Sequence, residues 1–136
     1  MKAPKKRILI TGSREMTPEM QKKAFRITKQ LIAKGVTIIV GEAEGVDQAV
    51  VDLANAMHYK HISVYGAYGK MRRKTHDGKN IEIDGSYPER DVAMVNECTG
   101  CCSIWNGKSR GTKITFEEAL RQEKPVVHLH KAPKKP

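Results

Sequence analysis

Aromatic residues are scarce in this 136-residue chain, at 5% of the sequence, so Val, Ile, Leu, Ala and Met must fill its interior. No apolar run approaches the roughly 20 residues that a membrane-spanning helix needs. The basic start, Met1 to Arg7, leads into a short strand-like run instead of the apolar core of a secretory signal. These absences exclude a helical membrane protein and favour a cytoplasmic location. We expect one domain over residues 1–136, large enough to fold without disulfides.

Cysteine is rarer still, and Cys98, Cys101 and Cys102 are the three present. A zinc site needs a fourth ligand and a loop that gathers the thiolates. The trio instead spans the end of an expected helix and the start of an expected strand, where Cys packs as a small hydrophobe. The chain also lacks a G-x-S-x-G turn and a metal-binding helix. We therefore expect no metal and no cofactor.

Positive charge is abundant, with a net charge of +10. Much of it lies in two tails, residues 1–6 and 131–136, and the rest includes a central cluster of Lys70, Arg72, Arg73, Lys74 and Lys79. Such clusters are either solvated ends or a surface that attracts nucleic acid. The shortage of aromatics disfavours the base stacking that many single-strand binders use.

Strand-like and helix-like segments alternate along the chain. The expected strands are Lys6–Ile10, Thr37–Val40, His61–Tyr65, Cys101–Trp105 and Pro125–His130. Helix starts are indicated by an N-cap at Thr17 and by a capping box from Ser86 to Glu89. A long polar stretch, residues 66–85, is expected to be a loop. This order predicts an α/β fold, a Rossmann-like three-layer sandwich with a mainly parallel sheet of about five strands.

Three of the expected strands end in polar turns that contain glycine and lead into helices. Ligands bind beyond the carboxyl ends of parallel strands, and helix N-termini attract phosphate. Glycine lets the backbone approach an anion, although tight turns also need glycine for steric reasons alone. Asp47 either faces a ribose or base or caps its helix. The predicted ligand-binding residues are Thr11, Gly12, Ser13, Arg14, Gly41, Glu44, Gly45, Asp47, Ser109, Gly111 and Thr112.

Four motifs together resemble the SLOG superfamily. They are T-G-S-R after the first strand, G-E-A-E-G-V-D after the second, Arg90 in a helix, and S-R-G-T before the last helix. The pattern is most similar to YspA-like proteins and is related to the lonely-guy phosphoribohydrolases and to DprA. Glu42 replaces a usual Gly, and Asp91 stands where Asn is common. The resemblance implies a Rossmannoid nucleotide pocket and a homodimer or homotetramer.

Two classes of function follow from this pattern. A hydrolase would cleave the N-glycosidic bond of a nucleoside 5′-monophosphate, which requires a carboxylate near the sugar. Candidate catalytic residues are Glu118 first, then Glu117 and Asp47, and Arg14 or Arg90 would supply the positive charge for the phosphate. The alternative is a protein without chemistry, either a nucleotide or signal sensor or a DprA-like nucleic-acid binder.

Overall fold

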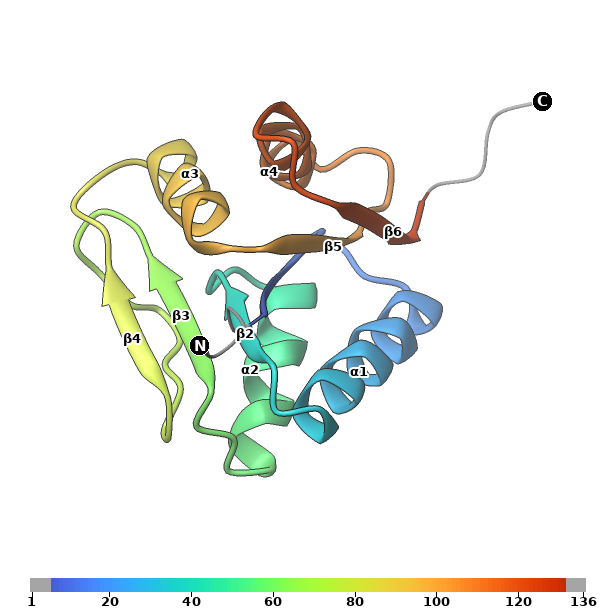
Figure 1. Ribbon diagram of the computed structural model, residues 1–136, viewed down its shortest axis with the longest axis vertical. Coiled ribbons are helices and arrows are strands. Elements are labelled where there is room, and N and C mark those ends of the chain that lie inside the picture. Colours follow the sequence, from blue (N-terminus) through green and yellow to red (C-terminus); the bar gives the residue numbers. More distant parts are fainter. Residues whose placement is uncertain (1–5, 132–136) are drawn as a thin grey trace, which may run out of the picture.

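Strands and helices alternate along the chain in the computed structural model, which describes residues 6–131 (Figure 1). The strands are β1 (Arg7–Gly12), β2 (Thr37–Val40), β3 (Ile62–Gly66), β4 (Lys79–Glu82), β5 (Gly100–Ile104) and β6 (Val126–His130). The helices are α1 (Pro18–Ala33), α2 (Val46–Ala56), α3 (Tyr87–Glu97) and α4 (Arg110–Arg121). The strands form one parallel sheet in the order β4-β3-β2-β1-β5-β6.

The sheet is covered on both faces. Helices α1 and α2 lie together on one face, and α3 and α4 lie together on the other (Figure 1). The predicted Rossmann-like three-layer α/β fold is therefore confirmed, with six strands where about five were expected. The additional strand, β4, lies inside the stretch expected to be a loop. It is a short edge strand with mostly exposed side chains, so its sequence carries little of the apolar pattern that marks the other strands.

Strand order reverses at the centre of the sheet. From β1 the chain builds outward through β2 and β3 to β4, and it then returns to place β5 on the other side of β1. The connections that leave β1 and β5 therefore diverge to opposite faces. In open α/β sheets a crevice forms at such a switch point, beyond the carboxyl ends of the two strands.

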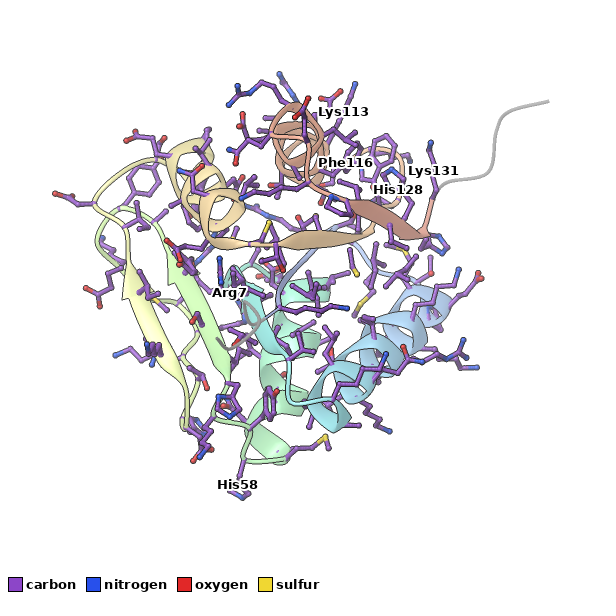
Figure 2. All side chains as sticks on the ribbon, viewed as in Figure 1. Arg7, His58, Lys113, Phe116, His128 and Lys131 are labelled. Atoms are coloured by element: carbon purple, nitrogen blue, oxygen red, sulfur yellow. The ribbon has the colours of Figure 1, made fainter. Side chains whose placement is uncertain are left out.

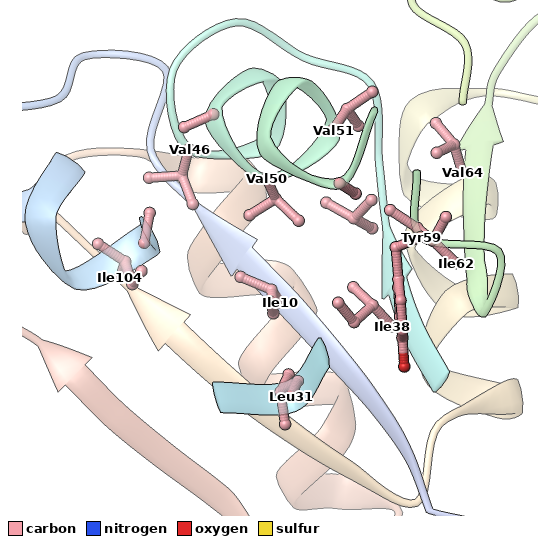
Figure 3. Packing of buried hydrophobic residues seen from close by; sticks show 14 of the residues in the cluster. Ile10, Leu31, Ile38, Val46, Val50, Val51, Tyr59, Ile62, Val64 and Ile104 are labelled. Atoms are coloured by element: carbon pink, nitrogen blue, oxygen red, sulfur yellow. The ribbon is translucent and has the colours of Figure 1, made fainter. Parts of the chain in front are cut away.

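Two apolar cores hold the layers together. Between the sheet and the helices α1 and α2, Ile10 and Ile38 pack against Val46 and Val50 (Figure 3). On the other face, Phe116 of α4 lies beside His128 of β6, with ring centroids 4.9 Å apart (Figure 2). Aliphatic side chains supply most of both cores, as the shortage of aromatics predicts.

The helix starts that the sequence predicts are present. Thr17 caps α1 by accepting a hydrogen bond from the Met20 amide at 3.1 Å. Ser86 and Glu89 form the predicted capping box at the start of α3. Both caps satisfy amide groups that a helix N-terminus leaves unpaired.

The cysteines lie at the end of α3 and in β5. Cys98 and Cys101 are buried, and burial raises the pKa of all three thiols above the ordinary value. Within residues 6–131 no group of three or more His, Cys, Asp or Glu side chains is placed to hold a metal ion. The same residues include no helix long and apolar enough to cross a membrane. Most of the two basic tails lies outside the described residues.

Candidate functional site

A cavity of about 530 Å³ lies at the switch point of the sheet, where β1 and β5 end. Its volume is in the range of pockets that hold small ligands. The lining comes from the end of β1 and the loop after it, from the turn after β2 and the start of α2, from α3, and from the loop after β5 and the start of α4. The lining residues are Thr11, Gly12, Arg14, Glu15, Ala43, Asp47, Tyr87, Arg90, Asp91, Asn106, Lys108, Ser109, Arg110, Gly111, Thr112 and Thr115.

The N-terminus of α4 forms one wall of this cavity. Ser109 is its N-cap, and the Asn106 side chain accepts hydrogen bonds from the Lys108 and Ser109 amides at 2.8 and 3.0 Å. The indole of Trp105 donates to the Ser109 carbonyl at 2.9 Å. Hydrogen bonds with the side chains of Asn106 and Trp105 thus fix the turn before α4. Gly111 faces open space, since nothing lies within 4 Å of a Cβ built there. The wall offers free amide groups and the positive end of a helix dipole.

Positive side chains surround this wall. Arg14, Lys108 and Arg110 all line the cavity, and Arg14 and Arg110 are exposed at its rim. Arg and Lys form charge-assisted hydrogen bonds with phosphate, which are shorter and stronger than neutral ones. This end of the cavity is suited to a phosphate group.

Asp47, on the first turn of α2, forms part of the floor. It does not cap its helix, whose N-cap is Gly45 without a side-chain hydrogen bond. Instead Asp47 Oδ2 accepts from the Ala43 amide at 3.2 Å and so closes the turn after β2. Burial raises the pKa of Asp47 to about 7, against the attraction of Arg90, which lowers it. A carboxyl group with this pKa exchanges a proton near neutral pH.

Arg90 projects from α3 beside Asp47. Both side chains adjoin Gly41, where an added Cβ would lie 2.7 Å from Asp47 Oδ2 and 3.3 Å from Arg90 Cζ. Arg90 is 7% exposed and donates to Asp91 Oδ1 at 3.1 Å. Its Nη1 atom is buried and has no hydrogen-bond partner among the described residues, although Glu42 Oε1 lies 3.6 Å away. A buried donor without a partner is costly, so this atom is suited to bind an acceptor on a ligand.

Glu42 lies behind the floor and is 1% exposed. Its carboxylate accepts from Nε and Nη2 of Arg72 at 2.7 and 3.0 Å and from the Arg72 amide at 2.9 Å. The ring of Tyr87 contacts both Arg72 and Arg90, each with Cζ 5.2 Å from the ring centroid. Glu42, which replaces the usual Gly of the second motif, therefore forms ion pairs with both Arg72 and Arg90.

Eight of the residues predicted from the sequence meet in this cavity. They are Thr11, Gly12, Arg14, Asp47, Arg90, Ser109, Gly111 and Thr112. Ser13, Gly41, Glu44 and Gly45 belong to the same turns but do not line it. Ser13 is fully buried and its hydroxyl accepts from the Asn106 amide at 2.9 Å, while Glu44 is exposed to solvent.

Two of the turn glycines, Gly12 and Gly45, are surrounded too closely to carry a side chain. A Cβ on Gly12 would lie 2.4 Å from Val46 Cβ, and one on Gly45 would lie 2.3 Å from the Ser13 and Arg14 carbonyl oxygens. Gly45 also has a φ of +81°, which L side chains rarely adopt. Close packing therefore explains why glycine occupies positions 12 and 45, without a role in ligand binding.

Glu117 and Glu118 lie on α4 outside the lining of the cavity. Glu117 is exposed, and Glu118 forms an ion pair with Arg121 and accepts from Gln122 at 2.8 Å. The hydrogen bonds from Arg121 lower the pKa of Glu118. Neither acid lines the cavity that contains Arg90 and Asp47.

Half of the lining was not predicted from the sequence. These residues are Glu15, Ala43, Tyr87, Asp91, Asn106, Lys108, Arg110 and Thr115. Most are direct neighbours of predicted ones, so widening each motif by a few residues would have included them. Tyr87 is different because its place depends on how α3 lies across the sheet.

The fold occurs in several solved structures. A molybdenum cofactor binding protein from Rippkaea orientalis is 18% identical, with a TM-score of 0.75 over 92% of this chain and 76% of the other. DNA processing protein A from Helicobacter pylori, described in a single-stranded DNA binding mode, is 17% identical, with a TM-score of 0.72 over 89% of this chain and 63% of the other. The molybdenum cofactor carrier protein from Chlamydomonas reinhardtii is 18% identical, with a TM-score of 0.71 over 90% and 75%. At these identities the likeness establishes the fold alone.

Sequence comparison identifies the family. No curated protein matches the chain significantly. The sequence profile described as DNA recombination-mediator protein A, however, matches residues 1–74, which is more than half of the chain. The match covers the first two motifs and confirms the resemblance to the SLOG superfamily, to which DprA was expected to be related. This chain belongs to the DNA recombination-mediator protein A family.

Proposed function

We propose that this chain binds a 5′-phosphorylated nucleotide, or a ligand derived from one, in the cavity at the switch point. One observation carries the proposal: the N-terminus of α4, flanked by cations, and the buried Arg90, whose Nη1 atom makes no hydrogen bond among the described residues, line the same cavity. The helix end is complementary to phosphate. Arg90 and Asp47 on the floor are complementary to the oxygens of a sugar or base, and the ring of Tyr87 offers an aromatic surface.

The similar structures support a binding role. Two of them are named for the molybdenum cofactor and one for single-stranded DNA. Those ligands belong to those proteins, and the chain spans only 63% of the DNA processing protein. What this chain shares with them is the fold.

A matched pair of ligands tests the phosphate contact. A ligand that binds only the folded state raises the melting temperature. AMP is expected to raise it, whereas adenosine, which lacks only the phosphate, is expected to raise it far less at the same concentration. Equal shifts for the two ligands would place the phosphate outside the site, and no shift for any nucleoside monophosphate would contradict the proposal.

Hydrolysis of the N-glycosidic bond is a second step that the same site could perform. The observation that favours it is Asp47, a buried carboxyl group on the cavity floor with a pKa of about 7. General acid–base catalysis is most effective when the pKa lies near the working pH. A sensor would bind the nucleotide in the same cavity without turnover. Release of free base from the bound nucleotide would distinguish a hydrolase from a sensor.

Nucleic-acid binding is the second candidate function, and the family match favours it. Lys70, Lys74 and Lys79 of the central cluster are exposed, whereas Arg72 and Arg73 are hydrogen-bonded to Glu42. Contacts from lysines to phosphates make affinity fall steeply with salt. An oligonucleotide affinity that does not change between 50 and 200 mM salt, roughly the range over which phosphate contacts weaken strongly, would contradict it.

A further inference from the structure

A second, smaller cavity of about 240 Å³ lies next to the main one. It is lined by Glu42, Ala67, Tyr68, Lys70, Arg72 and Tyr87. Tyr87 lines both cavities, and Glu42 in the second lies 3.6 Å from Arg90 in the first. The boundary between the two therefore consists of the side chains of Glu42, Arg72 and Tyr87, which we call the partition.

Glu42 holds this partition together. All three hydrogen bonds that Arg72 makes to another side chain end on the Glu42 carboxylate, two from its guanidinium and one from its amide. Arg73 adds a hydrogen bond to the Glu42 carbonyl at 2.9 Å. The Arg72 side chain is 39% exposed, so without Glu42 only the Tyr87 ring would keep it from turning to solvent.

The other end of the segment does not depend on Glu42. The Tyr68 amide donates to the Gly85 carbonyl at 2.7 Å, and the Gly69 amide donates to the Ile83 carbonyl at 3.0 Å. Tyr68 also packs its ring edge-to-face on Tyr87, with centroids 5.1 Å apart. Loss of the Glu42 side chain would therefore release Arg72, while the hydrogen bond from Arg73 to the carbonyl at position 42 and the turn at Tyr68 and Gly69 stay in place.

We propose that Glu42 is a specificity-determining residue that closes the main cavity against the second one and limits the ligand to the length of one nucleoside monophosphate. The choice of ligand length rests on the function proposed above, whereas the closure itself does not. With glycine at this position the two spaces would join. The joined site would offer Tyr68, Lys70 and a freed Arg72 to a second phosphate or sugar. A ligand such as ADP-ribose would then reach from one cavity into the other.

Two substitutions separate closure from charge. Glu42→Gly removes the side chain, whereas Glu42→Gln keeps its volume and one acceptor oxygen. Asp84→Gly, at an exposed position on the neighbouring turn, is the matched control for a change from acid to glycine. The affinities of AMP and ADP-ribose are measured by calorimetry for wild type and each variant.

Wild type is expected to bind AMP at least tenfold more tightly than ADP-ribose. Glu42→Gly is expected to reduce that ratio at least tenfold by gaining affinity for ADP-ribose, and Glu42→Gln and Asp84→Gly are expected to keep it. A ratio unchanged in Glu42→Gly overturns the proposal. An equal change in Glu42→Gln also overturns it, because charge and not closure would then set the preference.

Amide hydrogen exchange tests the closure without any ligand. In Glu42→Gly the Arg72 amide is expected to exchange at least tenfold faster, while the Tyr68 and Gly69 amides keep their wild-type rates as internal controls for folding. Unchanged exchange at Arg72 overturns the proposal. If exchange rises but wild type binds neither AMP nor ADP-ribose, the nucleotide site fails and the closure by Glu42 stands.

Discussion

Arg90 contacts one oxygen of Asp91 twice: its Nε donates a hydrogen bond to Asp91 Oδ1 at 3.1 Å, and its Nη2 forms an ion pair with the same atom, also at 3.1 Å. The two residues are neighbours on α3, and burial raises the pKa of Asp91 while the guanidinium lowers it. Two of the three guanidinium nitrogens are thereby occupied, and Nη1 alone is left without a hydrogen bond. An asparagine at position 91 would accept hydrogen bonds but would bring no negative charge to this buried cation. The Asp91 that departs from the common motif thus fixes the orientation of Arg90.

Arg90→Lys tests the role of the unpaired nitrogen. Lysine keeps the positive charge but has a single nitrogen, which we expect to remain with Asp91, so the donor to the ligand is lost. A hydrogen bond to a charged group contributes about 1.5–3 kcal/mol, so AMP should bind roughly 10- to 100-fold more weakly in calorimetry. Arg26→Lys, on the exposed face of α1, is the control. An AMP affinity within twofold of wild type would show that Arg90 does not contact the ligand.

Gly111→Val tests the wall at α4. Because nothing lies within 4 Å of a Cβ at this position, the valine side chain should fit without disturbing the fold and should occupy the cavity instead. The melting temperature without ligand is expected to stay at the wild-type value or rise slightly, while the increase caused by AMP is lost. An AMP-induced shift that survives in the variant would move the phosphate to another part of the molecule.

Gly12→Ala should have the opposite effect, a loss of stability. Its Cβ would lie 2.4 Å from Val46 Cβ, so the variant overpacks the contact between β1 and α2. Overpacking typically costs about 1–3 kcal/mol, which urea unfolding would measure directly. Adding Val46→Gly to Gly12→Ala removes the Cβ that the new methyl group would meet and should recover part of the loss. Additive effects of the two substitutions would contradict the steric explanation.

Gly12 and Gly111 are both turn glycines before a helix, and the sequence alone does not distinguish their roles. Periodicity and caps predicted the layers, the parallel sheet and the edge where the cavity lies. Whether a turn glycine faces a ligand or a packed valine depends on the neighbouring helix, which local pattern does not describe. Glu118 was chosen by counting helical turns from Thr112, but its direction is set by the rotation of α4 and its pairing with Arg121. The partner of Glu42 lies 30 residues away in a segment expected to be a loop.

Stability should depend on pH through Asp47. Its pKa is about 7 in the folded chain and 3.8 as an ordinary aspartate, so between these values the folded state holds one more proton than the unfolded state. Its contribution to the free energy of unfolding therefore falls as pH rises from 3.8 to about 7 and is constant above that. The loss is on the order of 4 kcal/mol at most. The measurement is the difference between wild type and Asp47→Asn in urea unfolding from pH 4 to pH 8. A constant difference over that range would mean that Asp47 ionises normally.

Catalysis, if the chain performs it, should depend on Asp47 and not on Glu118. Of these two acids, Asp47 lines the cavity beside Arg90, whereas Glu118 is paired with Arg121 outside the lining. Asp47→Asn is nearly isosteric and can still accept from the Ala43 amide, so it should leave AMP binding largely intact. A lost acid–base group lowers turnover by roughly 10²- to 10⁴-fold. Glu118→Gln, as the matched control, should turn over at the wild-type rate.

The assay for this last prediction is chromatographic detection of free base released from a panel of ribo- and deoxyribonucleotides. Activity in wild type that is lost in Asp47→Asn but kept in Glu118→Gln supports hydrolysis on the cavity floor. Loss in Glu118→Gln alone would return the catalytic carboxylate to α4, as its distance in helical turns from Thr112 first indicated. If wild type binds a nucleotide tightly and releases no base from any of the panel, hydrolysis is wrong. The buried Asp47 then acts as a hydrogen-bonding group of a sensor, and its protonation near pH 7 tunes binding instead of turnover.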